Sequence, residues 1–307
     1  MRSDNIFQKV SDKKWPLSRN ENLTEFGSQY PDYSELHEFL ETKFDIPRQY
    51  ICLTSGAEEA IRICLSSPNH PNRLNFTPTW GLVSIFNNLY GTEKVKELSL
   101  KRDLSYNISK LKKHIENNQI VYLANPNNVG SFTTASDLLE LIKRFKKTIF
   151  IIDETYAEFH FYESLIRFVP IYKNLIVVKS FSKAFGLASK RAGFYATKNK
   201  YFVDLRPANP ISDETIKSVF KSFDTVELAV KSLEKGKKYI IKELKSEFSV
   251  LKTKGNFIVF KYSNILEMRL RRISDYQVFS VKKQKYIKIT ALPLDLAVEF
   301  IKDLQSE

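Results

Sequence analysis

The sequence predicts an α/β fold with a mostly parallel central sheet flanked by helices. Three short runs are continuously apolar, as strands of a parallel sheet are when both faces are buried: 120–124, 149–152 and 175–178. Apolar residues at helical spacing lie between these runs, as in 134–146. The 307 residues are enough for one large domain and a smaller C-terminal α+β lobe, which is the organisation we expect.

The composition is that of an ordinary globular protein, with 43% hydrophobic and 27% charged residues. A formal net charge of +13 favours anionic small molecules as ligands, and it would also suit nucleic acid or an anionic membrane. The sequence contains no zinc-ligand spacing, RNP-like motif or dense basic block, and no uninterrupted apolar run of 18 residues. We therefore expect no nucleic-acid partner, no membrane span and no metal.

The cysteine usage indicates a reducing compartment. Cys52 and Cys64 are the two cysteines, too few for a disulfide framework and too far apart for a Cys-x-x-Cys pair. The first fifteen residues are polar and charged and contain no apolar signal core. A cytoplasmic protein is the expectation.

An anion site is predicted early in the chain. After an amphipathic helix at 34–44, a short apolar strand at 50–53 runs into the turn 54–59 and then into a second helix. Backbone N–H groups at a helix N-terminus lack partners within the helix, and the helix dipole favours negative charge there. Ala57 and Glu58 are therefore expected to offer main-chain donors to an anion.

Polar residues follow two of the buried strands at the end where ligands bind in open α/β sheets. The strand 120–124 runs into 125–131, with the sequence Asn-Pro-Asn-Asn-Val-Gly-Ser, and the strand 149–152 runs into Asp153. A carboxylate buried at a strand end needs a cation beside it. A metal–nucleotide site is disfavoured, because no Gly-x-x-x-x-Gly-Lys-Ser/Thr loop accompanies Asp153.

The third apolar strand leads into the stretch that organises the predicted site, 180–193, with the sequence Ser-Phe-Ser-Lys-Ala-Phe-Gly-Leu-Ala-Ser-Lys-Arg-Ala-Gly. Lys183 follows a rigid strand end, and a lysine in such a place can form a Schiff base with a carbonyl. Ser180 and Ser182 bring hydroxyl donors, and Arg191 adds a planar, permanently charged fork that suits phosphate. Together they predict an anchored phosphate beside an imine-forming amine.

The remaining elements complete the large domain and build the lobe. We expect a helix at 78–89, after the run 74–76, and a strand at 193–197 in the large domain. The predicted C-terminal elements are helices at 213–223 and 226–248, a strand at 257–260, a helix at 264–273, a strand at 286–290 and a helix at 294–304. The predicted domains are an N-terminal arm at 1–30, a large domain at 31–205 and a small domain at 206–307, with an interdomain helix near 213–248.

The stretch 180–193 resembles the Ser-x-Ser-Lys-(x)7-Arg signature of fold-type I pyridoxal 5′-phosphate (PLP) enzymes. It is most similar to the histidinol-phosphate aminotransferase branch of the class I/II aminotransferases. The resemblance implies a PLP-transferase fold of type I, with PLP held by the large domain and joined to Lys183. It also implies that the cofactor phosphate is bound by Ser180, Ser182, Arg191 and the main chain of Ala57 and Glu58.

Three further features are similar to the same family. The run 153–156, Asp-Glu-Thr-Tyr, resembles the family's Asp-Glu-Ala-Tyr, which implies that Asp153 pairs with the pyridine nitrogen and Tyr156 with the phenolic oxygen of PLP. Asn128 closes a run similar to the family's Asn-Pro-Asn-Asn, which implies that it bonds the same oxygen. Trp80 stands where the family has an aromatic ring stacked on the pyridine.

The N-terminal segment is similar to the part of the family that crosses a dimer interface. Asn-Glu-Asn at 20–22 and Tyr-Pro-Asp at 30–32 carry this resemblance. It implies a homodimer with shared active sites, in which Tyr30 reaches the cofactor phosphate of the other subunit. It further implies that Asn22 lies near the substrate.

The chain departs from the family at several positions. Ala57 replaces a short side-chain ligand in the phosphate turn, so one hydrogen bond to the phosphate is expected to be absent. Val129 replaces a proline in the loop that carries Asn128. Lys288 stands in a Tyr-Ile-Lys-Ile-Thr strand where the family has the arginine that grips the substrate carboxylate. An ammonium is a point charge, whereas a guanidinium binds a carboxylate through two parallel bonds.

These observations predict a PLP-dependent aminotransferase that uses an amino-acid donor and a small, phosphorylated acceptor. A ketone without a carboxylate, such as dihydroxyacetone phosphate going to serinol phosphate, fits the loss of the arginine at Lys288. The alternative is a PLP-dependent decarboxylase of a phosphorylated amino acid, of the threonine-phosphate or serine-phosphate type. A non-catalytic PLP-binding regulator is a third class, which usually carries an added DNA-binding domain.

Overall fold

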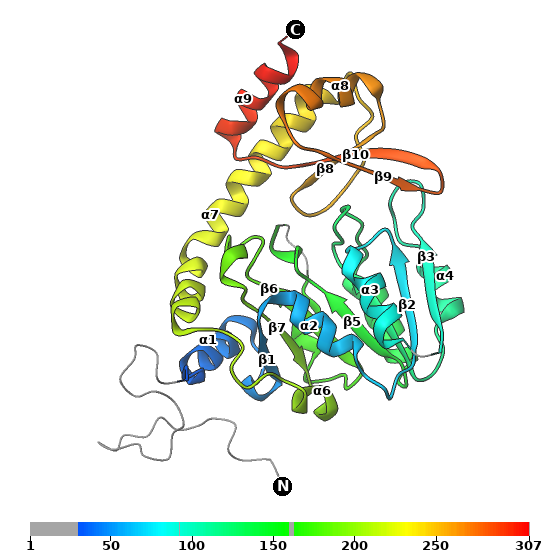
Figure 1. Cartoon of the computed structure of the whole chain (residues 1–307), viewed down its shortest axis with the longest axis vertical. Helices are drawn as coiled ribbons and strands as arrows, with labels where there is room; N and C mark the ends of the chain where they lie inside the picture. The colour runs from blue at the N-terminus through cyan, green and yellow to red at the C-terminus, as the bar shows by residue number, and fades with distance from the viewer. Residues whose placement is uncertain (1–29, 92, 160–162, 307) are drawn as a thin grey trace.

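The computed structural model describes residues 30–91, 93–159 and 163–306. It contains a seven-stranded sheet and a three-stranded sheet, and the long helix α7 (Asp213–Leu244) runs from one to the other (Figure 1). The strands of the larger sheet are β1 (Ile51–Thr54), β2 (Asn72–Thr77), β3 (Val95–Ser99), β4 (Gln119–Ala124), β5 (Ile149–Asp153), β6 (Leu175–Ser180) and β7 (Gly193–Thr197).

The larger sheet is mostly parallel, which confirms the predicted fold class. Its strand order is β1-β7-β6-β5-β4-β2-β3, and the strands from β6 to β3 run parallel to one another. β7 runs antiparallel to both of its neighbours, β6 and β1. The carboxyl ends of β4, β5 and β6 therefore meet at one edge of the sheet, where the predicted site residues follow them.

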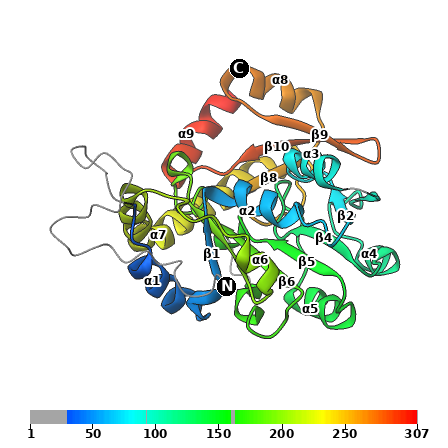
Figure 2. The same ribbon diagram turned by 60° about the horizontal axis from the view of Figure 1, so that its bottom comes forward.

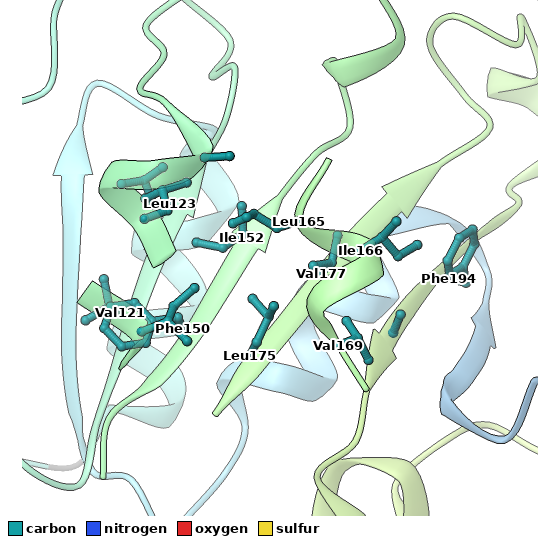
Figure 3. Packing of buried hydrophobic residues seen from close by; sticks show 14 of the residues in the cluster. Val121, Leu123, Phe150, Ile152, Leu165, Ile166, Val169, Leu175, Val177 and Phe194 are labelled. Atoms are coloured by element: carbon teal, nitrogen blue, oxygen red, sulfur yellow. The ribbon is translucent and has the colours of Figure 1, made fainter. Parts of the chain in front are cut away.

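Alternating side chains of the central strands pack on opposite faces of this sheet. In β5, Ile149 and Ile151 belong to one apolar cluster, whereas Phe150 and Ile152 belong to the other. Figure 3 shows the second face, where Phe150 and Ile152 lie among side chains of the neighbouring strands. A fully buried side chain of this size stabilises the fold by roughly 1.5–3 kcal/mol, so this alternation fixes which face each helix covers.

Helices cover both faces of the larger sheet (Figure 2). The face that carries Ile149 and Ile151 is covered by α2 (Gly56–Leu65), α3 (Gly81–Tyr90) and α6 (Lys200–Asp204). The opposite face is covered by α1 (Ser34–Phe44), α4 (Ile108–His114) and α5 (Ala135–Arg144). Short 3-10 helices lie at Arg48–Tyr50, Ala157–Phe159, Leu165–Phe168 and Ala188–Lys190.

One continuous helix, α7, replaces the two helices predicted at 213–223 and 226–248, so that prediction was wrong. The predicted break was at Asp224 and Thr225, but the hydroxyls of Ser222 and Thr225 bond back into the helix. Ser222 Oγ donates to the carbonyl of Val219 at 2.7 Å, and Thr225 Oγ1 donates to that of Ser222 at 3.4 Å. Neither proline nor glycine occurs at 222–225, and the helix continues through Gly236 to Leu244.

The C-terminal residues form an antiparallel sheet in the order β8-β10-β9. Its strands are β8 (Phe257–Lys261), β9 (Gln277–Val281) and β10 (Gln284–Thr290), and its helices are α8 (Asn264–Ile273) and α9 (Leu294–Gln305). A separate apolar cluster joins this sheet to α8, α9 and the end of α7. The edge strands β3 and β9 have several exposed polar residues and no apolar run that would predict them. Within the described residues, no helix combines the length and apolar character needed to cross a membrane.

The contact of α7 with the chain entering α9 leaves no room for a side chain at Gly236. A Cβ atom there would lie 1.9 Å from the main-chain oxygen of Leu292. We predict that Gly236→Ala lowers the free energy of unfolding by about 1–3 kcal/mol, because overpacking outweighs the higher helix propensity of alanine. Denaturant unfolding measures this, with Lys235→Ala at an exposed position of the same helix as the control. A Gly236→Ala protein as stable as the control would contradict the close approach.

Candidate active site

The register of the parallel strands brings the polar strand ends together. Ala124 of β4 pairs with Asp153 of β5, and Asp153 pairs with Val178 of β6. The loops that begin at Asn125, after Asp153 and at Phe181 therefore leave the sheet side by side. This is the arrangement that the apolar runs predict.

The N-terminus of α2 and Arg191 lie against each other. Thr54 of β1 pairs with Gly193 of β7, so the turn before α2 meets the loop that carries Arg191. A Cβ atom on Gly56 would lie 3.1 Å from an Arg191 guanidinium nitrogen, and one on Gly193 would lie 2.9 Å from the main-chain nitrogen of Ala57. The two glycines thus let the guanidinium and the first amides of α2 share one small space, which suits an anion.

The side chains around this cradle are partly exposed. Arg191 forms a 3.7 Å ion pair with Glu58, in which both side chains are about half exposed. Such a pair is weak in water and yields readily to a competing anion. Ser180 is buried and its Oγ accepts a 3.1 Å hydrogen bond from the main-chain nitrogen of Ser182. Ser180 is thus the last residue of β6, and Ser182 directly precedes Lys183.

Asp153 is a buried carboxylate without a cation. Its Oδ2 accepts a 2.6 Å hydrogen bond from the hydroxyl of Tyr122, and its Oδ1 accepts a 2.9 Å bond from the main-chain nitrogen of Thr155. Among the residues that the structure describes, no lysine, arginine or histidine forms an ion pair with it. Burial raises the pKa of Asp153 despite these two bonds. A positively charged N–H group placed here would favour its ionised form.

Tyr156 lies between Asp153, whose charge acts on its hydroxyl, and Lys183, whose amine lies near its ring. The exposed amine of Lys183 lies 5.7 Å from the centre of the Tyr156 ring. The ring is held edge to face by Phe257 at 4.8 Å. Burial, with the nearby charge of Asp153, raises the pKa of Tyr156 to about 12, so its hydroxyl keeps its proton and can donate a hydrogen bond.

Lys288 reaches the same place from the smaller sheet. Its side chain is buried, and Nζ donates a 2.9 Å hydrogen bond to the main-chain oxygen of Asn128 and lies 4.7 Å from the centre of the Phe257 ring. Burial, followed by the charge of Lys183, lowers the pKa of Lys288 to about 8. The structure thus places a second amine beside Lys183, and next to it the Oδ1 atom of Asn128 is buried without a hydrogen-bond partner.

Trp80 and Tyr30 are placed less closely. Trp80 immediately precedes α3 and packs edge to face on Phe86 at 6.2 Å. Its segment is tied to the loop of Asn128 because Asn127 Nδ2 donates to the main-chain oxygen of Pro78 at 3.2 Å. Tyr30 is 52% exposed in the single chain. Asn22 lies outside the described residues.

Sequence reasoning missed two groups that hold the site. Tyr122 bonds Asp153, and Lys179 lies buried between Glu154 and Glu158, at 3.0 and 2.8 Å. Burial acts to lower the pKa of Lys179, but the two carboxylates together raise it above its usual value. A lysine inside an otherwise apolar strand run was the available signal, since a buried charge needs a partner. In the described part of the chain, no three His, Cys, Asp or Glu side chains gather in a way that could hold a metal ion.

Comparison with known proteins identifies the family. The family model of aminotransferase class I and II matches residues 20–281. The chain belongs to this family. It is 31% identical over 251 residues to the histidinol-phosphate aminotransferase of Brachyspira hyodysenteriae, covering 76% of this chain and 69% of that protein.

Solved structures show the same fold. The histidinol-phosphate aminotransferase from Clostridium acetobutylicum matches with a TM-score of 0.80 and 20% identity, covering 90% of each chain. The histidinol-phosphate aminotransferase from Sinorhizobium meliloti, solved in complex with pyridoxal-5′-phosphate, matches with a TM-score of 0.77 and 18% identity, over 90% of this chain and 83% of that one. L-threonine-O-3-phosphate decarboxylase from Porphyromonas gingivalis matches with a TM-score of 0.73 and 19% identity, over 90% and 89%. The fold is therefore PLP fold type I, and the chain is a PLP-dependent transaminase by its family.

The residues present fit PLP. The cradle between Arg191 and the N-terminus of α2 is open because Gly56 and Gly193 have no Cβ atoms, and it offers amide and guanidinium donors to a phosphate. Asp153 offers a buried carboxylate to a protonated ring nitrogen. Lys183 supplies an exposed amine beside them. When bound, PLP supplies the electron sink that transamination requires.

Replacing Asp153 tests two effects separately: its effect on the free energy of unfolding and its effect on catalysis with the cofactor. The folded protein binds the Asp153 proton more tightly than the unfolded chain does, so this carboxyl costs stability as the pH rises through its raised pKa. We predict that Asp153→Asn makes the cofactor-free protein more stable at pH 8, with the gain vanishing below the ordinary pKa of 3.8. The same variant should lose about 10²–10³-fold in kcat, because an uncharged amide cannot favour a protonated ring.

Unfolding by denaturant at pH 8 and pH 4 tests the first part, and steady-state kinetics with added PLP test the second. Asp275→Asn, at an exposed position between α8 and β9, is the control. If Asp153→Asn is the less stable protein at pH 8, the carboxylate is held favourably by Tyr122 and Thr155 alone.

Proposed function

We propose that the chain transfers an amino group from an amino-acid donor to a small phosphorylated ketone that has no carboxylate. The observation that carries this proposal is the position of Lys288, a single buried ammonium 2.9 Å from the main-chain oxygen of Asn128 and close to Lys183. One ammonium with a lowered pKa holds a carboxylate less firmly than a guanidinium does. An acceptor without a carboxylate does not need that grip.

The names of similar proteins support the phosphorylated class. Histidinol phosphate is a phosphorylated amino alcohol, so the ketone related to it has a phosphate and no carboxylate. Dihydroxyacetone phosphate, which gives serinol phosphate, belongs to the same chemical class and is the smaller candidate. The net charge of +13 supports an anionic substrate but does not choose between these two.

Each candidate residue has one role in this proposal. The phosphate of PLP is held by Ser180, Ser182, Arg191 and the main-chain nitrogens of Ala57 and Glu58. Asp153 pairs with the ring nitrogen, Asn128 and Tyr156 bond the phenolic oxygen, and Trp80 stacks on the ring. Lys183 would hold the cofactor, and its freed amine would carry a proton between the substrate Cα atom and the C4′ carbon of PLP. Lys288 binds the donor carboxylate.

The N-terminal residues are proposed to complete the site in a homodimer. Tyr30 is half exposed and lies in the segment that precedes α1, and this exposure suits a side chain that serves another subunit. Asn22 is proposed to lie near the substrate. The two cysteines are free and buried, which supports a reducing, cytoplasmic location.

The activity is tested by two half-reactions. The cofactor-loaded protein is converted to its pyridoxamine phosphate form with a series of amino acids, and phosphorylated ketones are then screened for return of the original absorbance. We expect return with the ketones of histidinol phosphate or serinol phosphate and none with their unphosphorylated forms. Release of carbon dioxide from threonine phosphate or serine phosphate, without net amino transfer, would instead make the protein a decarboxylase.

Replacing Lys183 tests its double role. Lys183→Ala should still bind PLP through the phosphate cradle, but turnover should fall by about 10²–10⁴-fold or more because the amine that moves the proton is gone. Borohydride should fix the cofactor covalently on the wild type and not on the variant, as mass spectrometry shows. Lys190→Ala, in the same loop, is the control and should behave as the wild type. Undiminished turnover in Lys183→Ala would end the Schiff-base assignment.

Replacing Lys288 tests carboxylate binding. The Lys288 ammonium is protonated below its pKa of about 8 and neutral above it, so the donor KM should rise as the pH passes 8. Lys288→Arg should remove this rise. It should also raise the kcat/KM for the donor by a factor equivalent to about 1–2 kcal/mol of transition-state stabilisation, since charge-assisted hydrogen bonds contribute about that much. It should bring no matching gain for an acceptor without a carboxylate. Lys285→Arg, exposed on the same strand, is the control. If Lys288→Ala leaves donor and acceptor kinetics unchanged, Lys288 does not bind substrate.

A further inference from the structure

A pocket of about 170 Å³ lies between α7 and the segment 253–256, which leads into β8. It holds far more than the roughly 10–15 Å³ that one water needs, and it is smaller than the roughly 300–1,000 Å³ of sites for drug-sized ligands. One wall is apolar, with Val230, Leu233 and Phe159. The pocket therefore has the size of a small ligand.

The other wall carries three lysines, Lys237, Lys238 and Lys254, against one carboxylate, Glu234, whose charge acts on all three, so its net charge is positive. Glu234 is already paired with Lys238 at 2.8 Å. Lys237 and Lys254 form no ion pair with any carboxylate that the structure describes, and Lys237 Nζ donates to two main-chain oxygens of the segment at 2.9 and 3.2 Å. Burial, followed by the charge of Lys254, lowers the pKa of Lys237 to about 8. An anion in this pocket would relieve the repulsion between the two lysines.

Asn256 narrows the chemistry of that anion. Its side chain lines the pocket, and its Oδ1 atom is buried and accepts no hydrogen bond. A ligand that fits must bring negative oxygens to the lysines and an O–H donor to this amide oxygen. Hydrogen phosphate has both, whereas sulfate and carboxylates are acceptors only near neutral pH.

We propose that this pocket is a second phosphate site, which takes inorganic phosphate or a small phosphate ester. It shares no residue with the cradle formed by Arg191 and the start of α2. Its apolar wall favours a ligand with a short carbon chain, and a hydroxyl on that chain can supply the O–H donor that a doubly ionised phosphate ester lacks near neutral pH. A hydroxylated phosphate ester should therefore bind more tightly than inorganic phosphate.

The segment 253–256 connects this site to the active site. Lys254 donates its main-chain N–H to the oxygen of Gly130 at 2.9 Å, and a Cβ atom on Gly130 would lie 2.4 Å from Thr253. Gly255 approaches Tyr156. A Cβ atom placed on Gly255 would lie 3.8 Å from the Cβ atom of Tyr156. Phosphate bound to Lys237 and Lys254 thus holds the segment that packs on Tyr156 and on the loop of Asn128.

The test is a calorimetric titration of inorganic phosphate into the full chain loaded with PLP and without substrate. The cofactor phosphate then fills the cradle at Arg191. We expect a saturable site with affinity reduced at least about tenfold by Lys254→Met and by Val230→Trp, which fills the pocket; a substrate phosphate subsite would appear as a second site that these variants leave unchanged. Lys235→Met, on the exposed side of the same helix, should bind as the wild type. Sulfate should bind several-fold more weakly, and glycerol phosphate more tightly.

Two results would overturn the proposal: no saturable phosphate binding to the wild type, or binding that persists unchanged in Lys254→Met and Val230→Trp. Phosphate bound only in a substrate subsite would give the second result. Cofactor absorbance and thermal unfolding confirm that each variant is folded, and Lys254→Met is the milder change if Val230→Trp is not. Because the titration contains no substrate and no turnover, its outcome is independent of the proposed function.

Discussion

The buried ion cluster of Lys179 with Glu154 and Glu158 fixes the segment on which the rest of the site depends. Its three side chains lie under the carboxyl ends of β5 and β6, and the ammonium is within 3.0 Å of both carboxylates. Removing one partner of such a buried pair costs roughly 3–5 kcal/mol, because the other charge is left without compensation. The ion cluster therefore favours one backbone conformation from Asp153 to Glu158, and that conformation sets the positions of Asp153 and Tyr156.

Within this fixed frame, two charges remain uncompensated by the chain itself. Burial raises the pKa of Asp153 and lowers that of Lys288, so each is displaced toward its neutral form. Ionisable groups shifted toward their neutral forms in this way are typical of functional sites, since a structural pair would be satisfied internally as Lys179 is. We propose that a protonated ring nitrogen is the partner of Asp153 and that an anionic substrate is the partner of Lys288. The chain thus pairs the buried charges of its framework with its own side chains, whereas the ionisable groups of its site suit a cofactor and a substrate.

Local sequence patterns predict the strand ends but not the contacts between them. The continuous apolar run before Asp153 is enough to place that carboxylate at the edge of a parallel sheet. The contact of Arg191 with Gly56 depends on the antiparallel pairing of β1 with β7, which no local pattern encodes. The continuity of α7 through Ser222 depends on hydroxyls bonding back to the helix instead of capping it. In each case the local sequence is compatible with two structures, and a tertiary contact or a side-chain rotamer decides which one forms.

The hydrogen bond from Lys288 to the oxygen of Asn128 shows why the lysine is more than a weaker arginine. An ammonium has three donors and a guanidinium has five in a planar fork. One donor of Lys288 is used on the loop that carries Asn128, and its neighbour Phe257 covers another side at 4.7 Å. At most two donors then remain for a ligand, and they cannot lie parallel as a carboxylate would require. The same amine that joins the smaller sheet to the cofactor loop therefore has little capacity left to orient a carboxylate, which is the physical reason to expect recognition of the acceptor elsewhere, at its phosphate.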